Sequence, residues 1–79
     1  MPKFFVDFQD NDTHHEDGEG NDLPGFGQAR KEAVGFLSEI ARDKLSDDEH
    51  RKFVAIVRDE NGTPLYRASL IFHGEQLVP

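Results

Sequence analysis

The stretch from Phe26 to Leu45 constrains the fold of this chain most, because it alone carries a long apolar repeat of about 3.6 residues. On a helical wheel one half of this stretch is apolar, and the other half is mainly charged or polar. The apolar half consists of Phe26, Ala29, Ala33, Val34, Phe36, Leu37, Ile40, Ala41 and Leu45. Gly35 lies at the middle of the polar half. The pattern predicts one amphipathic helix that lies on a sheet and turns its charged side to water.

The boundaries of this helix have weaker signals. Pro24 fixes the entry, and Gly25 stands at the expected N-cap, where it offers no side-chain acceptor. After the helix, Ser46-Asp47-Asp48-Glu49 has the form of a capping box. We therefore predict a further helical turn that begins there.

Strand patterns flank the helix on both sides. Lys3 to Phe8 alternates, with Phe4, Val6 and Phe8 on one side. Arg51 to Asp59 and Pro64 to Phe72 predict a hairpin around Asn61-Gly62, the strongest short hairpin signal. With a two-residue loop, the predicted cross-strand pairs are Phe53 with Leu70, Ala55 with Ala68, Val57 with Tyr66, Val54 with Ser69, Ile56 with Arg67, and Arg58 with Leu65. The first three pairs form the predicted core face.

Between the first strand and the helix the chain is strongly polar. We expect residues 10–22 to form an acidic, mobile loop, with a short strand near Thr13 to Glu16, and residues 74–79 to form a tail. The whole chain, 1–79, is predicted to be a single α+β domain. Its expected architecture is one α-helix packed on a small antiparallel sheet, in β(β)αββ order.

The net charge is −7, and it is concentrated near the N-terminus. Residues 1–25 carry seven acids against one base, whereas residues 51–79 carry four bases against three acids. Direct nucleic-acid binding needs a basic surface, so this balance argues against it. The chain has no cysteine, no apolar run of membrane-spanning length and no signal-peptide core, and we expect a cytoplasmic protein without membrane contact.

The acidic segment has oxygen donors of the kind that calcium prefers, but their spacing does not fit an EF-hand. The donors are Asp10, Asp12, Glu16, Asp17, Glu19, Asn21 and Asp22. Counted from Asp17, the sixth position is Asp22 rather than glycine, and the twelfth is Gln28 rather than glutamate. His14-His15-Glu16 has no zinc-site spacing either. We predict no specific metal and no cofactor, and keep metal-dependent chemistry at this segment as the weakest hypothesis.

Catalytic residues are not indicated. None of the three serines, Ser38, Ser46 and Ser69, lies in a G-x-S-x-G motif. The glycine-containing run Gly18-Glu19-Gly20 carries an acid where a phosphate-binding loop needs amides and a lysine. We therefore predict that the protein is not an enzyme.

The sheet face opposite the helix is the predicted site of function. It would carry five large apolar side chains, enough for a partner contact, interrupted by Ser69 and two arginines. The apolar residues are Phe5, Val54, Ile56, Leu65 and Ile71, and the arginines are Arg58 and Arg67. Arg58 and Arg67 would flank the contact and pair with carboxylates of the other chain. The competing interpretation is that Leu23, or Leu77 and Val78 of the tail, folds over this face.

Three sequence pieces together resemble a known family. They are the aromatic strand Lys3-Phe4-Phe5-Val6-Asp7-Phe8, the passage Asp17-Gly18-Glu19-Gly20 to Leu23-Pro24 with the helix after it, and Val57-Arg58-Asp59-Glu60-Asn61-Gly62. In this order they are similar to small proteins of soil and plant-associated alphaproteobacteria, filed as a domain of unknown function. The resemblance implies a bacterial α+β module and no catalytic residues.

Two functions from different classes follow from these observations. The first is a small non-enzymatic interaction module, a homodimer or an accessory subunit that binds another protein. The alternative is an acidic nucleic-acid mimic that blocks the basic groove of a partner protein, which rests on the net charge of −7.

Overall fold

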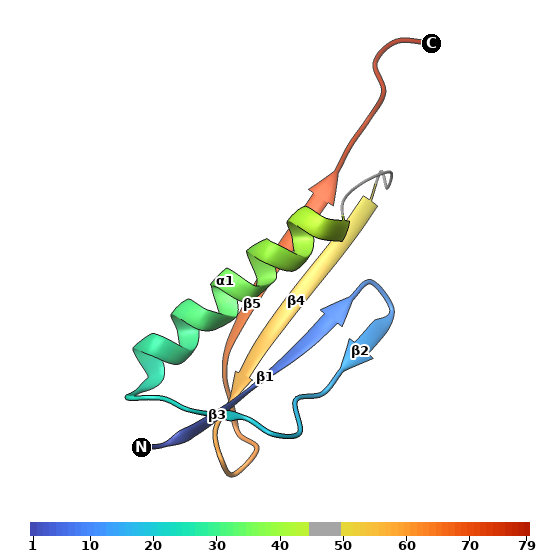
Figure 1. Ribbon diagram of the computed structural model, residues 1–79. Coiled ribbons are helices and arrows are strands. Elements are labelled where there is room, and N and C mark those ends of the chain that lie inside the picture. Colours follow the sequence, from blue (N-terminus) through green and yellow to red (C-terminus); the bar gives the residue numbers. More distant parts are fainter. Residues whose placement is uncertain (45–49) are drawn as a thin grey trace.

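A computed structural model describes residues 1–44 and 50–79, and it has one helix on one antiparallel sheet (Figure 1). The elements are β1 (Lys3–Asp10), β2 (Thr13–His15), β3 (Asn21–Asp22), α1 (Phe26–Lys44), β4 (His50–Arg58) and β5 (Pro64–His73). The predicted α+β class and element order are confirmed, with β3 as an added strand. Leu45 and the predicted capping box at 46–49 lie outside the described residues.

The sheet has the spatial order β2–β1–β4–β5, with every neighbouring pair antiparallel. β1 pairs with β4 along residues 5–10, while its other side pairs with β2 at one end and with β3 at the other. β5 lies at the opposite end of this order, and among the described elements it pairs with β4 alone.

The β4–β5 hairpin keeps the predicted register over most of its length. Five predicted pairs are present: Phe53 with Leu70, Val54 with Ser69, Ala55 with Ala68, Ile56 with Arg67, and Val57 with Tyr66. The sixth prediction is wrong, because Arg58 pairs with Pro64 instead of Leu65. A register shift between Val57 and Arg58 leaves Leu65 as the extra residue of a bulge.

The turn explains that bulge. The Gly62 N–H donates to the Asp59 carbonyl oxygen (3.1 Å), and the Asp59 N–H donates to the Thr63 carbonyl oxygen (3.0 Å). Gly62 has φ +83°, so the loop is a turn of three residues, 60–62, closed by a left-handed glycine. The predicted two-residue loop is therefore wrong. An odd loop alone would turn one strand over, and the extra residue at Leu65 restores the predicted faces.

α1 covers one face of the sheet, mainly over β4 and β5 (Figure 1). The buried core consists of Phe4, Phe8, Ala29, Ala33, Leu37, Ala41, Phe53, Ala55 and Val57. Three of the four core residues from α1 are alanines, so the helix backbone lies close to the sheet. Three others of its predicted apolar half, Phe26, Val34 and Phe36, are about 40% exposed at the margins of the contact.

A cluster of polar groups lies at the margin of the core, near the C-terminal end of α1. Asp10 is 8% exposed on the helix-covered face, where Arg51 donates to both carboxylate oxygens at 2.9 and 2.8 Å. Arg51 also donates to the Lys44 carbonyl oxygen at 3.2 Å, which satisfies an acceptor at the helix end. Asp10 therefore belongs to β1 and to the core margin, and not to the acidic loop predicted over 10–22.

The rest of the acidic segment is structured. β2 confirms the predicted strand near Thr13 to Glu16, and it follows a tight turn in which Asn11 has φ 52°. β3 then brings residues 21–22 back to the start of β1. The mobility that we expect for this segment stays a prediction. The tail extends away from the sheet beyond the end of β5 (Figure 1).

Candidate interaction surfaces

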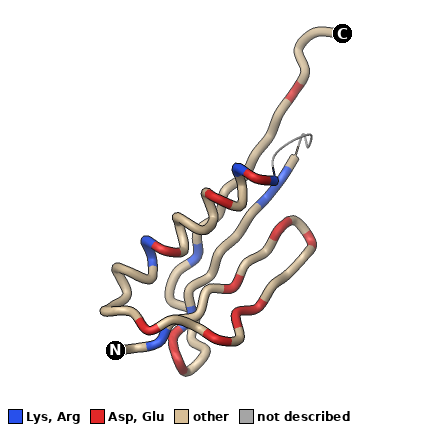
Figure 2. The backbone as a smooth tube through the Cα atoms, viewed as in Figure 1, with Lys and Arg blue, Asp and Glu red and all other residues tan. Residues whose placement is uncertain are grey.

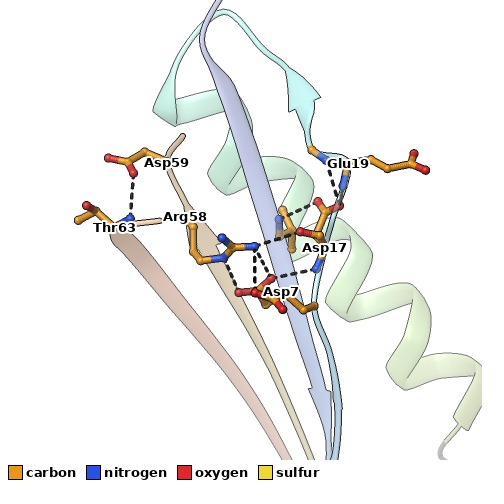
Figure 3. Close-up of polar contacts among 9 residues, drawn as sticks. Asp7, Asp17, Glu19, Arg58, Asp59 and Thr63 are labelled. Atoms are coloured by element: carbon orange, nitrogen blue, oxygen red, sulfur yellow. Dashed lines mark hydrogen bonds and ion pairs between the residues drawn. The ribbon is translucent and has the colours of Figure 1, made fainter. Parts of the chain in front are cut away.

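The sheet face opposite α1, here called the far face, carries a partly buried ion pair (Figure 3). Asp7 is 8% exposed, although no described helix covers this face. Arg58 donates to its carboxylate twice, from Nε to Oδ2 at 2.6 Å and from Nη2 to Oδ1 at 3.0 Å. The guanidinium also lies 5.1 Å from the centre of the Phe5 ring, in cation–π geometry. β1 and β4 thus supply a bidentate pair across the sheet.

Asp17 ties the acidic segment to this pair. Its backbone N–H donates to Asp7 Oδ1 (3.0 Å), and its carbonyl oxygen accepts from Arg58 Nη2 (3.0 Å). Its carboxylate accepts from three backbone N–H groups, those of Val6 (3.0 Å), Glu19 (3.1 Å) and Gly20 (3.0 Å). Both oxygens are therefore engaged, and the acid serves as a local anchor.

Gly20 allows that anchor to form. It has φ +71°, a conformation that side chains rarely adopt. A methyl group there would lie 2.9 Å from Phe5 Cε2 and 3.0 Å from the Phe4 carbonyl oxygen. The passage Asp17-Gly18-Glu19-Gly20, which carried part of the family resemblance, is thus explained by local structure.

These contacts lower three aspartate pKa values below the ordinary 3.8. Burial would raise the pKa of Asp7, but the Arg58 hydrogen bonds and the Asp17 N–H outweigh it. Burial would also raise the pKa of Asp17, but hydrogen bonds from three backbone N–H groups outweigh this effect. For Asp10 the hydrogen bonds from Arg51 are the largest cause of the lowered pKa. The same Asp7 contact raises the pKa of Arg58.

The predicted partner residues have very different exposures. Val54 is buried at 7%, and Phe5, Ile56 and Arg58 are partly exposed. Leu65 at the bulge is 42% exposed and Ile71 is 69% exposed, with Arg67 exposed on the strand between them. The accessible apolar surface is therefore concentrated on β5 rather than at the centre of the sheet.

The predicted role of Arg58 in pairing with another chain is wrong. Its guanidinium is bonded to Asp7 and to the Asp17 carbonyl oxygen, so it is not available for carboxylates of another chain. Asp7 was missing from the predicted set. The alternation of residues 3–8 places it beside Phe5 on the face that also holds Arg58, which was the available signal.

The segments expected to cover the far face do not do so. Leu23 packs against the core on the helix-covered side. Leu77 and Val78 are 87% and 69% exposed on the extended tail. The interpretation that the chain covers this face with those residues is therefore wrong.

The two edges of the sheet also differ. On the β1 side, β2 and β3 pair with its ends, and the Asp17 carboxylate takes the Val6 N–H between them. On the other side, β5 is an edge strand over residues 64–73, and among the described residues no strand pairs with its outer side. The outer side of β1 is thus largely occupied, whereas the outer side of β5 is open.

A groove that the sequence did not predict runs between α1 and β1. Since α1 lies over β4 and β5, it leaves part of β1 open on the helix-covered face, and the resulting hollow measures about 610 Å³. Its apolar lining consists of Phe4, Val6, Phe8, Leu23, Phe36 and Ile40. Its polar lining consists of His15, Glu16, Asp17, Asn21, Glu32 and Lys44. We call it the α1–β1 groove.

The remaining candidates for a site are metal-binding groups, Ser38 and a pair of histidines. No group of three or more His, Cys, Asp or Glu among them could hold a metal ion. Ser38 Oγ donates to the Val34 carbonyl oxygen of its own helix. The structure does bring His50 and His73 together, with Nδ1 atoms 3.2 Å apart, because they are opposite each other in the hairpin. The absence of enzymatic activity and of a metal stays a prediction.

Comparison with known proteins identifies one family. The sequence model of a domain of unknown function, DUF6894, matches residues 3–71. No curated protein and no solved structure gives a significant match. Within the described residues, no helix is long and apolar enough to cross a membrane.

Proposed function

We propose, on the premise that the chain belongs to the DUF6894 family of unknown function, that it is a non-enzymatic interaction module that self-associates along β5. The observation that carries this proposal is the exposure of Ile71, which is 69% on an open edge strand. Natural sheets usually shorten, charge or cover their edges. On the β1 side this chain has the short strands β2 and β3, whereas β5 is 10 residues long and has Pro64 and Arg67 as its protective residues. We place the module in the bacterial cytoplasm, which its lack of cysteine suits.

An antiparallel contact between two β5 strands accounts for the side chains on that edge. Centred on Ala68, it pairs Leu65 with Ile71 of the second copy and Tyr66 with its Leu70. The same register sets Arg67 opposite Ser69, and so avoids the like-charge contact that centring on Arg67 would create. Apolar pairs then lie on both faces of the joined sheets.

The size of the domain favours such a contact. A chain of 79 residues buries a limited core, and β5 contributes mainly half-exposed side chains to it. Leu65 and Leu70 are 42% and 39% exposed. A second β5 strand would remove apolar surface from water on both sides and satisfy the open backbone groups.

Ile71→Glu is the sharpest test. It places a charge on the apolar edge at a side chain that contributes little to the core. Ile56 is a less suitable position, because it lies opposite Asp7 and a glutamate there would disturb the ion pair with Arg58. Val78→Glu is the matched control, because Val78 is also 69% exposed and lies on the tail, which extends away from the sheet. We expect wild type and V78E to sediment as dimers, and I71E to sediment as a folded monomer.

Two results would refute self-association. One is a wild-type chain that stays monomeric at high micromolar concentration. The other is an I71E variant that stays dimeric. If wild type is a monomer, the accessory-subunit form of the proposal is tested by whether an immobilised chain retains a protein partner that its I71E variant loses.

The acidic nucleic-acid mimic stays the alternative proposal. The acidic side chains gather along the segment from β1 to β3, which favours it (Figure 2). Against it, Asp7, Asp10 and Asp17 are held by arginines or backbone N–H groups, so they are poorly placed to imitate phosphates. A mimic's partner should be released steeply as salt rises, whereas an apolar β5 contact should persist.

A further inference from the structure

The α1–β1 groove combines an apolar floor with acidic walls. Phe36 on α1 is 40% exposed, and its ring lies 5.4 Å from the ring of Phe8 in edge-to-face geometry. Val6, Leu23 and Ile40 are only partly buried and pack against the same core. The floor therefore presents apolar side chains that the chain itself leaves half covered.

The α1 wall of the groove is acidic because the acidic and the basic residues of this helix lie on different flanks. Glu32 lines the groove, and Glu39, seven residues later, lies two turns along the same flank. Asp43 follows the groove residue Phe36 by the same interval. The cations Lys31 and Arg42 lie on a different flank of the helix.

The opposite wall is also acidic. It is formed by His15 at the end of β2 and by Glu16 and Asp17 after it. The Glu16 side chain is 72% exposed, and its Oε1 lies 3.9 Å from Arg58 Nη2. Lys44 is the cation among the lining residues, and its Nζ lies 3.9 Å from Asp10 Oδ2, so it is partly neutralised. An apolar floor between two acidic walls is complementary to an apolar segment with flanking lysines or arginines.

The backbone at the groove limits the shape of that segment. A strand could not extend the sheet here, because β2 and β3 pair with the ends of β1 and Asp17 accepts from the Val6 N–H. An incoming segment must satisfy its own backbone groups, and a helix does so internally. From Glu32 to Lys44, α1 provides about 18 Å of wall, enough for a partner helix of about three turns.

We infer that the α1–β1 groove binds a cationic amphipathic helix of a partner protein. Apolar side chains of that helix contact Phe8, Phe36 and Ile40, and its basic residues face Glu32 and Glu16. This site is separate from β5 and does not depend on self-association.

Two peptides and two pairs of variants test the inference. The first peptide has about 14 residues of leucine and lysine, with leucines at helical spacing. The second has the same composition in strict alternation, which suits a strand. Each is labelled and titrated with the protein, and its conformation is followed by carbon chemical shifts. We expect saturable binding of the first peptide as a helix, and binding at least about tenfold weaker of the second.

The variants separate the groove from general charge attraction. Phe36→Ser should weaken binding about tenfold, while Val34→Ser, an equally exposed position on another flank of α1, should leave it unchanged. Glu32→Lys should weaken binding about tenfold, while Glu75→Lys on the tail makes the same change of net charge with little effect.

The inference is overturned if the first peptide does not bind, if the alternating peptide binds equally well, or if E75K weakens binding as much as E32K. Circular dichroism of F36S establishes that it is folded, and E32K, which leaves the core intact, provides an independent outcome. I71E should bind the helical peptide as wild type does. Failure of self-association and failure of the groove site are thereby distinguished.

Discussion

Arg58 and Asp7 form a bidentate ion pair on the sheet face that α1 does not cover, with Nε–Oδ2 at 2.6 Å and Nη2–Oδ1 at 3.0 Å. The partners are 51 residues apart in sequence and come from adjacent strands. Through the backbone of Asp17 the same pair holds the acidic segment against β1. One contact therefore connects the first strand, the acidic segment and the hairpin.

Arg58→Met should destabilise the fold by about 2 kcal/mol, because it leaves the Asp7 carboxylate unpaired. This figure is below that of a fully buried pair, since the side chains are 19% and 10% exposed. Arg67→Met on the neighbouring strand is the control and should change the free energy of unfolding by less than about 0.5 kcal/mol. Urea denaturation measures both. In the double variant Asp7→Asn/Arg58→Met the cost should be less than the sum of the single costs, and additive costs would contradict the pair's importance.

Gly20→Ala should destabilise the fold by about 2 kcal/mol, through its positive φ and the crowding by Phe5 and the Phe4 carbonyl oxygen. Gly18→Ala, two residues earlier, is the matched control, because nothing lies within 4 Å of a methyl group there. Thermal or urea denaturation of the two variants makes the comparison. Equal midpoints for G20A and G18A would show that the loop has another conformation.

Gly35→Ala should stabilise the fold by about 0.5–1 kcal/mol, because alanine has the higher helix propensity and the position is open. Gly62→Ala provides the contrast, since its φ of +83° opposes any side chain. A lower denaturation midpoint for G35A would mean that another surface presses on this side of α1.

Acid should destabilise the protein. The folded pKa values of Asp7, Asp10 and Asp17 lie below the ordinary 3.8, so between the two values the unfolded chain binds more protons. The stability that these groups contribute is complete above that ordinary value and is lost as the pH falls below it. We expect urea midpoints that change little between about pH 7 and pH 5 and fall clearly toward about pH 3. Asp17→Asn should reduce the acid-dependent part, and an unchanged midpoint at low pH would contradict the assignment.

Local patterns in the sequence account for the helix and for most of the hairpin. The 3.6-residue repeat identified α1, because residues on one side of a helix recur every three to four positions in the sequence. Alternation in 53–57 and 66–70 likewise set five cross-strand pairs correctly. The predicted turn was wrong. A three-residue loop followed by a bulge leaves the same side chains on each face of the hairpin as a two-residue loop, so alternation cannot distinguish the two.

The surfaces depended on contacts that no local pattern encodes. Alternation in the sequence placed Ile71 and Arg67 together on the far face. Because Val54 is buried and Arg58 is paired with Asp7, the accessible part of this face lies on β5. The competing interpretation, in which the tail covers this face, is wrong, because nothing in the sequence determines the direction in which the tail leaves β5.

By itself, the sequence determined which segments form α1 and the sheet and which side chains face the core, because those properties repeat at short intervals along the chain. Tertiary structure alone decided where α1 sits across the sheet. Its place over β4 and β5 opens the groove beside β1. The physical reason is that packing of a helix on a sheet, and ion pairs such as Asp7–Arg58, join residues whose separation in sequence carries no periodic signal.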